Sequence, residues 1–171
     1  GIELTVTRQV LGWFDPPGDA ASLTLGRFPC WFIETEPPYG HYGFPITAHG
    51  QRGLKIALHK PGYPIVPDQL GLPGHDVREG EVEALREVLR SCLPGGDGPL
   101  LATRICLYTN SADQHFIVGP HPGFERVTLA AGFSGHGFKF ASVMGEVLAE
   151  LALDGATRHP IAFLSPDRFG P

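Results

Sequence analysis

The chain has 171 residues, of which 42% are hydrophobic and 18% charged, enough apolar material for a packed core and too little charge for a disordered chain. The net charge is −5, and its lysines and arginines are scattered without a basic stripe, which argues against nucleic acid as a partner. No apolar run approaches the roughly 20 residues that span a bilayer, so no membrane association is expected. Three well-separated cysteines do not form a disulfide framework and suit a reducing cytoplasm.

The first 60 residues or so predict short strands separated by turns. Apolar residues alternate with polar ones from Leu4 to Val10, so a strand begins almost at once. With no initiator Met ahead of it, this start suggests a chain cut from something longer. Further β-rich runs follow at 28–33, 42–45 and 53–59, and the short turns between them favour antiparallel pairing.

A Pro- and Gly-rich loop at 60–78 is predicted to be a connection rather than a lid. Apolar residues at helical spacing then predict an amphipathic helix over 79–93. Asp76 with Glu79 three residues later resembles a capping box, and Pro94–Gly96 should end the helix.

The last third predicts three strands and a helix. The strands fall at 101–109, 115–119 and 127–131, and the helix at 138–153 with Gly155 as its C-terminal cap. The run Val127–Ala131 is continuously apolar, which is typical of a strand in a sheet buried on both faces.

A glycine-rich turn, GFSGHG at 132–137, joins that strand to the last helix. Glycines let a backbone approach a ligand closely, and the N–H groups at a helix start favour negative charge, so the turn is a candidate anion or cofactor site. Its order is G-x-x-G-x-G, and the dinucleotide fingerprint G-x-G-x-x-G occurs nowhere in the chain. Lys139 in the first helical turn is disfavoured by the helix dipole, which suggests a separate task such as holding a carboxylate. A ligand-free turn and a solvated lysine are the alternatives.

Several motifs in fixed order resemble one family of flavoenzymes. They are CLYT at 106–109, DQHFI at 113–117 and AAGFSGHGFKF at 130–140, with RQV at 8–10, YGFP at 42–45 and GLK at 53–55 further upstream. The series is similar to the C-terminal region of monomeric sarcosine oxidase, N-methyltryptophan oxidase and pipecolate oxidase, and it covers nearly the whole chain.

The resemblance implies an α+β fold. An antiparallel substrate-domain sheet with helices would be followed by the terminal strand and helix of an FAD-binding α/β domain. Residues 1–100 would belong to the substrate domain and residues 101–171 to the FAD-binding domain. The N-terminal half that carries the G-x-G-x-x-G unit would be absent.

The resemblance also implies FAD as the cofactor. Cys106 matches the cysteine that forms a thioether with the 8α-methyl carbon of the flavin, whereas from the residues alone it could be a buried small hydrophobe. We expect the turn and the Cys106 thiol to face the same flavin. The predicted cofactor-binding residues of the turn and the helix start are Gly132, Phe133, Ser134, Gly135, His136, Gly137 and Lys139.

Four residues match catalytic positions of the family. Lys55 matches the lysine that promotes the reaction of reduced flavin with oxygen by stabilising negative charge. Lys139 matches the lysine that holds the substrate carboxylate. Tyr42 and His59 match residues that line the substrate cavity, and Tyr108 is expected to join them. The alternatives from the residues alone are an outward-facing strand lysine at Lys55, a solvated helix lysine at Lys139, and packed core roles for His59 and the tyrosines.

The implied reaction oxidises a secondary-amine amino acid such as sarcosine to an imine, with oxygen as acceptor and hydrogen peroxide as product. The family's partner arginine for the carboxylate lies in the absent half, so the isolated chain is expected to be inactive. The unpaired edge at 127–131 predicts self-association or a partner that carries the N-terminal half.

Two other interpretations remain open. The chain could be a non-catalytic fragment or a split subunit that binds no FAD alone. A metal-binding module built on His41, His49 and His59 is the other, but no H-E-x-x-H or paired C-x-x-C spacing supports it, and no metal is expected.

Overall fold

The computed structural model describes residues 1–170 as two compact units. Within these residues, unit 1 comprises residues 1–7 and 107–170, and unit 2 comprises residues 8–106. The predicted α+β class is confirmed, because strands and helices occur in separate runs along the chain. The assignment of these parts to a substrate domain and an FAD-binding domain stays a prediction.

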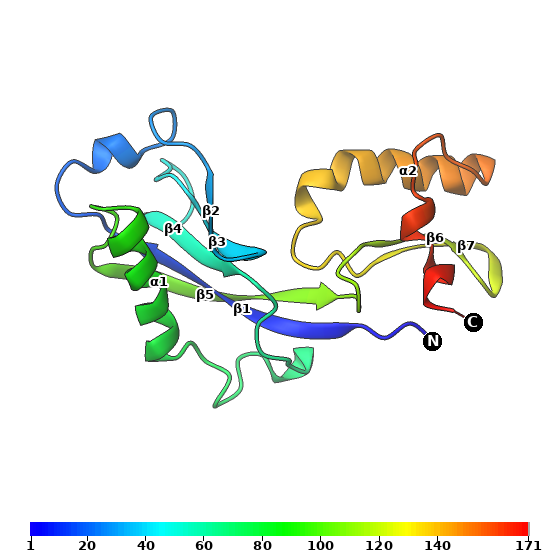
Figure 1. Ribbon diagram of the computed structural model, residues 1–171, viewed down its shortest axis with the longest axis horizontal. Helices are drawn as coiled ribbons and strands as arrows, with labels where there is room; N and C mark the ends of the chain where they lie inside the picture. The colour runs from blue at the N-terminus through cyan, green and yellow to red at the C-terminus, as the bar shows by residue number, and fades with distance from the viewer. Residues whose placement is uncertain (171) are drawn as a thin grey trace. The chain divides into compact units, whose positions relative to one another are not determined.

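Unit 2 is built on a five-stranded sheet with the order β2-β3-β4-β1-β5 (Figure 1). The strands are β1 (Thr5–Phe14), β2 (Trp31–Glu36), β3 (Tyr39–Phe44), β4 (Leu54–His59) and β5 (Leu100–Asn110). β4 pairs antiparallel with β3 on one side and with β1 on the other, and β2 pairs antiparallel with β3. The antiparallel pairing expected from the short turns is therefore confirmed for these strands.

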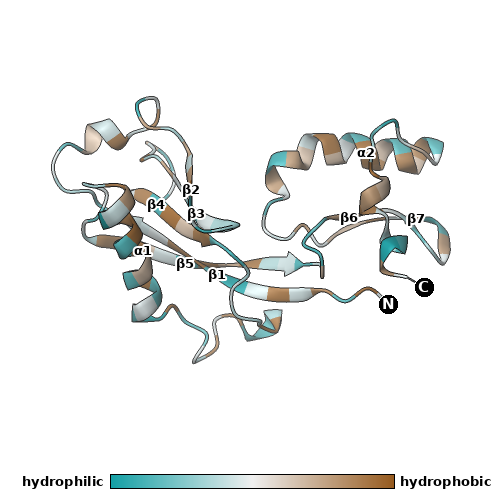
Figure 2. Cartoon of the chain, in the orientation of Figure 1, coloured by the Kyte–Doolittle hydropathy of each residue, from teal (hydrophilic) through white to brown (hydrophobic). Residues whose placement is uncertain are grey.

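Helix α1 (Glu79–Cys92) covers one face of this sheet. Phe14, Leu54 and Ile56 project toward it and pack against Leu85 and Leu89 in one buried cluster. Because side chains alternate between the faces of a strand, the residues between these apolar ones point to the other face. Figure 2 shows this alternation along β1 as bands of hydrophobic and hydrophilic residues.

The predicted cap of α1 is wrong. The helix begins after Arg78, whose extended backbone makes it the N-cap, and not after Asp76. The Glu81 carboxylate accepts a hydrogen bond from the Arg78 N–H at 2.9 Å and also pairs with the buried Arg8 side chain. Glu81 therefore fills the position predicted for Glu79, since it satisfies a free N–H at the helix start and a buried guanidinium together.

Unit 1 contains a hairpin of β6 (Ile117–His121) and β7 (Phe124–Ala131), followed by α2 (Ala141–Asp154). Its core joins Phe116, Val118, Met144, Val147 and Leu164. α2 ends at Gly155, whose left-handed backbone at φ 73° confirms the predicted cap. A 3-10 turn (Phe138–Phe140) precedes α2, so Lys139 lies in that turn, before the α-helix proper.

The expectation that Val127–Ala131 is buried on both faces is wrong for the described residues. β7 pairs with β6 alone in a two-stranded sheet, and every one of its residues is exposed or half-buried. The apolar sequence thus marks a strand whose second edge has no partner within residues 1–170. Such an edge presents unpaired N–H and C=O groups to a neighbour.

All three cysteines are free, as their spacing predicted. Across the part of the chain that the structure describes, neither helix is long and apolar enough to cross a membrane. Short 3-10 turns complete the chain at Ala20–Leu23, Pro67–Gln69, Ala162–Leu164 and Pro166–Phe169.

Truncating Leu89 to alanine should lower the free energy of unfolding by about 2–5 kcal/mol, because this fully buried side chain is central to the contact between α1 and the sheet. The matched change Glu87→Ala, at an exposed position of the same helix, should stay within about 0.5 kcal/mol. Urea denaturation followed by far-ultraviolet circular dichroism measures both. Equal stabilities of the two variants would contradict the packing described.

Candidate active site

In unit 2 the predicted catalytic residues gather on the sheet face opposite α1. We call it the aromatic face and define it by six residues that share it through strand register, which are Trp13, Phe32, Tyr42, Phe44, Lys55 and His59. The register places Phe44 and Trp13 directly opposite Lys55 on the two neighbouring strands. All six residues are exposed or half-buried, so the face is accessible to a ligand.

Short distances join the predicted residues on this face. The Lys55 Nζ lies 5.8 Å from the centroid of the Tyr42 ring, and the Tyr42 and His59 rings are 6.4 Å apart at nearly right angles. His59 also makes an edge contact with Phe32, at 6.3 Å between ring centroids. Tyr42, Lys55 and His59, which the sequence predicted as catalytic residues, therefore lie side by side.

The ionisable groups of Lys55 and Cys106 interact. Burial lowers the pKa of the Lys55 ammonium from its ordinary value, and the charge of Cys106 opposes that shift. Burial raises the pKa of the Cys106 thiol, while the Lys55 charge acts to lower it. Cys106 is thus a half-buried thiol whose ionisation is opposed by burial and favoured by a nearby cation.

In unit 1 the glycine turn folds onto β5. Ser134 takes a left-handed backbone at φ 47°, and its N–H donates to the Thr109 carbonyl at 3.0 Å. Its hydroxyl donates to the Gly132 carbonyl at 2.9 Å and receives the Ser111 N–H. Both partners of each of these hydrogen bonds belong to unit 1, so the bonds fix the shape of the turn.

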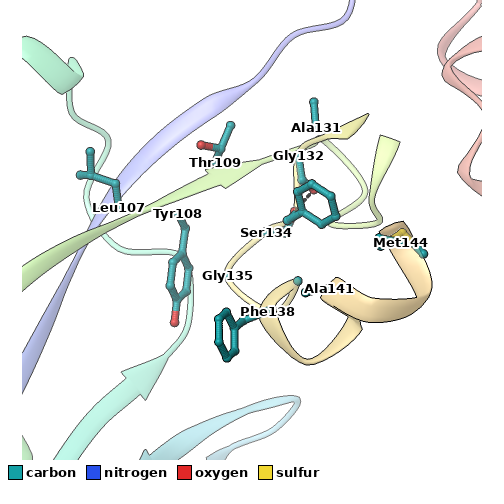
Figure 3. A pocket seen from close by; sticks show the side chains of 12 residues that line it. Leu107, Tyr108, Thr109, Ala131, Gly132, Ser134, Gly135, Phe138, Ala141 and Met144 are labelled. Carbon is teal, nitrogen blue, oxygen red and sulfur yellow. Dashed lines mark hydrogen bonds between the residues drawn. The ribbon is translucent and has the colours of Figure 1, made fainter. Parts of the chain in front are cut away.

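The Tyr108 ring packs flat against Gly135, as Figure 3 shows. A Cβ atom at Gly135 would lie 2.2–2.4 Å from three ring atoms, and the glycine has φ +76°. Only glycine allows this contact, because any side chain would need both a left-handed backbone and the space that the ring fills.

A cavity of about 720 Å³ opens beside the turn (Figure 3). Its lining is drawn from β5, the turn and the start of α2, and includes the predicted residues Tyr108, Gly132, Phe133, Ser134, Gly135 and Gly137. Within residues 1–170, the N–H groups of Gly135 and Gly137 donate to no protein acceptor. Free N–H groups in a glycine turn before a helix suit an electron-rich acceptor such as a flavin carbonyl or phosphate oxygen, so the turn fits FAD.

His136 and Lys139 line a different cavity, of about 380 Å³, against α2 and the C-terminal turns. His136 Nδ1 lies 3.0 Å from the Ser134 carbonyl oxygen, and its ring stacks on Phe116 at 4.8 Å. The exposed Lys139 ammonium donates to the His136 carbonyl at 3.1 Å and lies 5.1 Å from the Phe140 ring centroid. The roles predicted for these two residues, and the expectation that the turn and Cys106 face one flavin, stay predictions.

One cluster offers metal-ligand atoms within 4.8 Å of one another in the described chain, Glu146, Glu150 and His159. Arg158 pairs with both carboxylates and offsets their charge. His41, His49 and His59 belong to no such cluster among residues 1–170.

Sequence reasoning did not identify Trp13, Phe32 and Phe44 as members of the site. Each is an aromatic residue at an ordinary strand position, where a core role is the usual explanation. The available signal was that Phe44 stands two residues from Tyr42 and so shares its face of the strand, but only the pairing register shows that Trp13 and Phe32 join them.

Comparison with known proteins assigns the chain to a protein family. The model of the family described as FAD dependent oxidoreductase matches residues 6–151. The chain therefore belongs to this family, whose cofactor is FAD.

Within this family, the chain is similar to particular oxidases. The chain is 37% identical over 169 residues to monomeric sarcosine oxidase of Streptomyces avermitilis, covering 98% of this chain and 43% of that protein. It is 42% identical over 171 residues to monomeric sarcosine oxidase of an Arthrobacter species, covering 98% and 42%. N-methyl-L-tryptophan oxidase of Salmonella heidelberg is 38% identical over 146 residues, covering 85% and 37%. The predicted resemblance is confirmed, and the chain spans about two fifths of the length of these relatives.

Solved structures agree on the fold. NikD, described as an unusual amino acid oxidase essential for nikkomycin biosynthesis, superposes in its open form with a TM-score of 0.68 at 19% identity, covering 96% of this chain and 42% of that one. Fructosyl peptide oxidase from E. terrenum gives a TM-score of 0.71 at 19% identity, covering 95% and 40%. At these identities the likeness shows the fold alone.

Replacing Gly135 with alanine should lower the free energy of unfolding by about 1–3 kcal/mol, since the new methyl group would strike the Tyr108 ring in a left-handed backbone. Gly145→Ala in α2 is the matched control, because a Cβ there meets nothing within 4 Å and alanine favours a helix by up to about 1 kcal/mol. Chemical denaturation of both variants gives the comparison. A Gly135→Ala protein as stable as the wild type would refute the ring contact.

Alkylation by iodoacetamide should distinguish Cys106 from the exposed thiols of Cys30 and Cys92. At a pH near the ordinary thiol pKa of about 8.5, Cys106 should react more slowly than the two exposed thiols, because burial raises its pKa and so lowers its thiolate fraction. Lys55→Met should slow Cys106 further, since the charge that favours the thiolate is gone, whereas Lys60→Met, which removes a lysine paired with Glu36, should not. Mass spectrometry of the labelled peptides reports the rates, and faster labelling of Cys106 in Lys55→Met would show that the coupling is misassigned.

Proposed function

We propose that the chain is the C-terminal portion of a flavin-dependent oxidase that converts a secondary-amine amino acid, of the sarcosine type, to an imine with release of hydrogen peroxide. The observation that carries the proposal is the aromatic face, where Lys55, Tyr42 and His59 lie together and the charge of Cys106 interacts with Lys55. These four residues are the ones that the resemblance matches to the family's site, and their contacts support that assignment. The likeness to sarcosine and N-methyltryptophan oxidases supports the same substrate class.

Each residue has a distinct task in this proposal. When bound, the flavin accepts a hydride equivalent from the amine and passes electrons to oxygen. Lys55 provides a fixed positive charge that stabilises the negative charge developing on oxygen. Cys106 would hold the flavin covalently through its sulfur, and the Lys55 charge would favour the thiolate form of that sulfur.

Substrate contacts are assigned to four side chains. Tyr42 and His59 are proposed to line the site on the aromatic face, with the half-buried imidazole of His59 held between two rings. Tyr108 borders the cavity beside the glycine turn. Lys139 is proposed to bind the substrate carboxylate through its exposed ammonium, which would exchange its hydrogen bond to the His136 carbonyl for one to that anion.

The glycine turn is proposed to bind the flavin through its main chain. Gly135 and Gly137 offer N–H groups without protein acceptors, and the close packing of Tyr108 on Gly135 keeps the turn in one shape. Preformed donors cost no reorganisation when a ligand arrives, which favours tight binding of an electron-rich group. Phe133, Ser134 and His136 are assigned supporting contacts in the same turn.

A partner is proposed for the free edge of β7. The chain spans about two fifths of its relatives, and β7 has one paired edge and one open edge within the described residues. A polypeptide that carries the dinucleotide-binding half would complete the sheet there, and self-association is the alternative. Three unpaired cysteines support a cytoplasmic location.

The test is co-expression of this chain with the N-terminal part of a sarcosine oxidase relative that the chain does not cover. The complex should be yellow, keep its colour after acid precipitation, and release hydrogen peroxide with sarcosine. Cys106→Ser should lose the acid-stable colour, because oxygen replaces the sulfur that forms the thioether, while Cys30→Ser at an exposed thiol should retain it.

A complex that stays colourless would support the alternative of a non-catalytic fragment. Acid-stable colour in Cys106→Ser would overturn the assignment of the attachment residue alone. Flavin binding without peroxide release from sarcosine or other N-methyl amino acids would overturn the proposed reaction.

A further inference from the structure

Three aromatic rings surround the charged end of Lys55 on the aromatic face. The Lys55 Nζ lies 4.8 Å from the ring centroid of Phe44, 5.6 Å from that of Trp13 and 5.8 Å from that of Tyr42. All three distances are within the roughly 6 Å over which a ring attracts a cation through its quadrupole. Lys55 therefore has an aromatic enclosure, defined by these three rings.

The backbone pairing fixes this enclosure. Trp13 on β1 and Phe44 on β3 are the direct partners of Lys55 across the sheet, and Tyr42 stands opposite Ala57, the next residue on the same face of β4. Side chains opposite each other in an antiparallel pair have Cβ atoms only about 5 Å apart. The rings are consequently held by two strands, β1 and β3, on either side of the lysine on β4, rather than by loops.

The enclosure holds a cation without cancelling its charge. Within residues 1–170, Lys55 makes no ion pair with a carboxylate, whereas Lys60, five residues on, pairs with Glu36 at 2.6 Å. A carboxylate would fix the ammonium but would also neutralise the field that it projects. Aromatic rings restrain it through a weaker, neutral attraction, so the full positive charge remains available to an anion that forms nearby.

We propose that Trp13 is a positioning residue for the oxygen reaction, which holds the Lys55 ammonium in place from the β1 side of the sheet. This inference rests on the role proposed above for Lys55 and extends it to a residue that acts only through that lysine. Trp13 is the stronger candidate of the two direct partners, because it is half-buried and indole is the best cation–π acceptor, while the Phe44 side chain is 41% exposed.

A positioning role and a packing role differ in their kinetic consequences. A tryptophan that merely supports the sheet would, when truncated, impair substrate oxidation and flavin reoxidation together. A tryptophan that positions Lys55 would affect only the step in which negative charge develops on oxygen, since that is where the ammonium acts.

The experiment separates the two half-reactions by rapid mixing in the flavin-loaded complex described above. Flavin reduction is measured anaerobically with sarcosine, and reoxidation is measured by mixing the reduced protein with oxygen. The variants are Trp13→Leu, Trp13→Phe and Lys55→Met. Tyr63→Leu is the control, because it removes a comparable contact, with Arg78 at 5.4 Å from the ring centroid, elsewhere in the same unit.

Trp13→Leu should slow reoxidation by about tenfold, the factor that one cation–π contact supplies, and leave reduction within about twofold. Trp13→Phe should restore most of the rate, and Tyr63→Leu should match the wild type. The inference is overturned by wild-type reoxidation in Trp13→Leu when Lys55→Met is slow, or by an equal loss in both half-reactions. Wild-type reoxidation in Lys55→Met would overturn the proposed role of Lys55 and this inference with it.

A second measurement needs no flavin. In the 171-residue chain labelled with ¹³C-lysine, ring currents from the enclosure should shift the Lys55 Cε-bound protons upfield of those of Lys60 and Lys139. Trp13→Leu should reduce that shift and Tyr63→Leu should leave it unchanged. A Lys55 signal at the position of an exposed lysine in the folded wild-type chain would show that the enclosure does not exist.

Discussion

The candidate site depends on the alternation of side chains across the strands of unit 2. Phe14 of β1 and Leu54 and Ile56 of β4 are apolar and pack with α1, so the residues next to them along each strand point to the other face. Burial of Phe14, Leu54 and Ile56 therefore determines where Trp13, Lys55 and the neighbouring β3 rings project. A shift of register by one residue would exchange the two sets, placing a lysine in the core, and the cost of burying that charge forbids it.

The same constraint explains why the reactive groups are perturbed. A lysine in the middle of a sheet, between aromatic partners on both neighbouring strands, loses water that an edge lysine would keep. Burial lowers the pKa of Lys55 and raises the pKa of the Cys106 thiol, and the charge of each group partly offsets the pKa shift of the other. Two perturbed groups coupled in this way are characteristic of functional sites more than of structural ones.

In unit 1 the controlling feature is a turn that only glycine can form. The Tyr108 ring occupies the volume that a side chain at Gly135 would need, and the left-handed backbone at Ser134 is held by hydrogen bonds to Gly132 and Thr109. The result is a fixed loop whose glycines line the cavity together with the side chains of Tyr108 and Phe138 (Figure 3). A site of this kind recognises an extended, electron-rich ligand more readily than a particular substituent.

Much of the fold and of the candidate site could be predicted from the sequence, and the features that could not be predicted depend on contacts between distant residues. Periodicity located α1, α2 and the strands, and the ordered motifs identified the family. The cap of α1 was missed because Glu81 is recruited by Arg8, which lies far away in the sequence. The burial of β7 was overestimated because an apolar run does not reveal whether a second neighbour is present. Trp13 and Phe44 escaped notice because their meeting with Lys55 depends on cross-strand register, which single-strand patterns do not contain.

The central claim is that Lys55, on the aromatic face of unit 2, contacts the flavin together with Cys106. A crystal structure of the flavin-loaded complex tests it most directly. We predict the isoalloxazine ring on that face, with the Lys55 ammonium and the Cys106 sulfur both in contact with it. A structure in which other polypeptide covers the face, and the flavin ring contacts neither residue, would contradict the account.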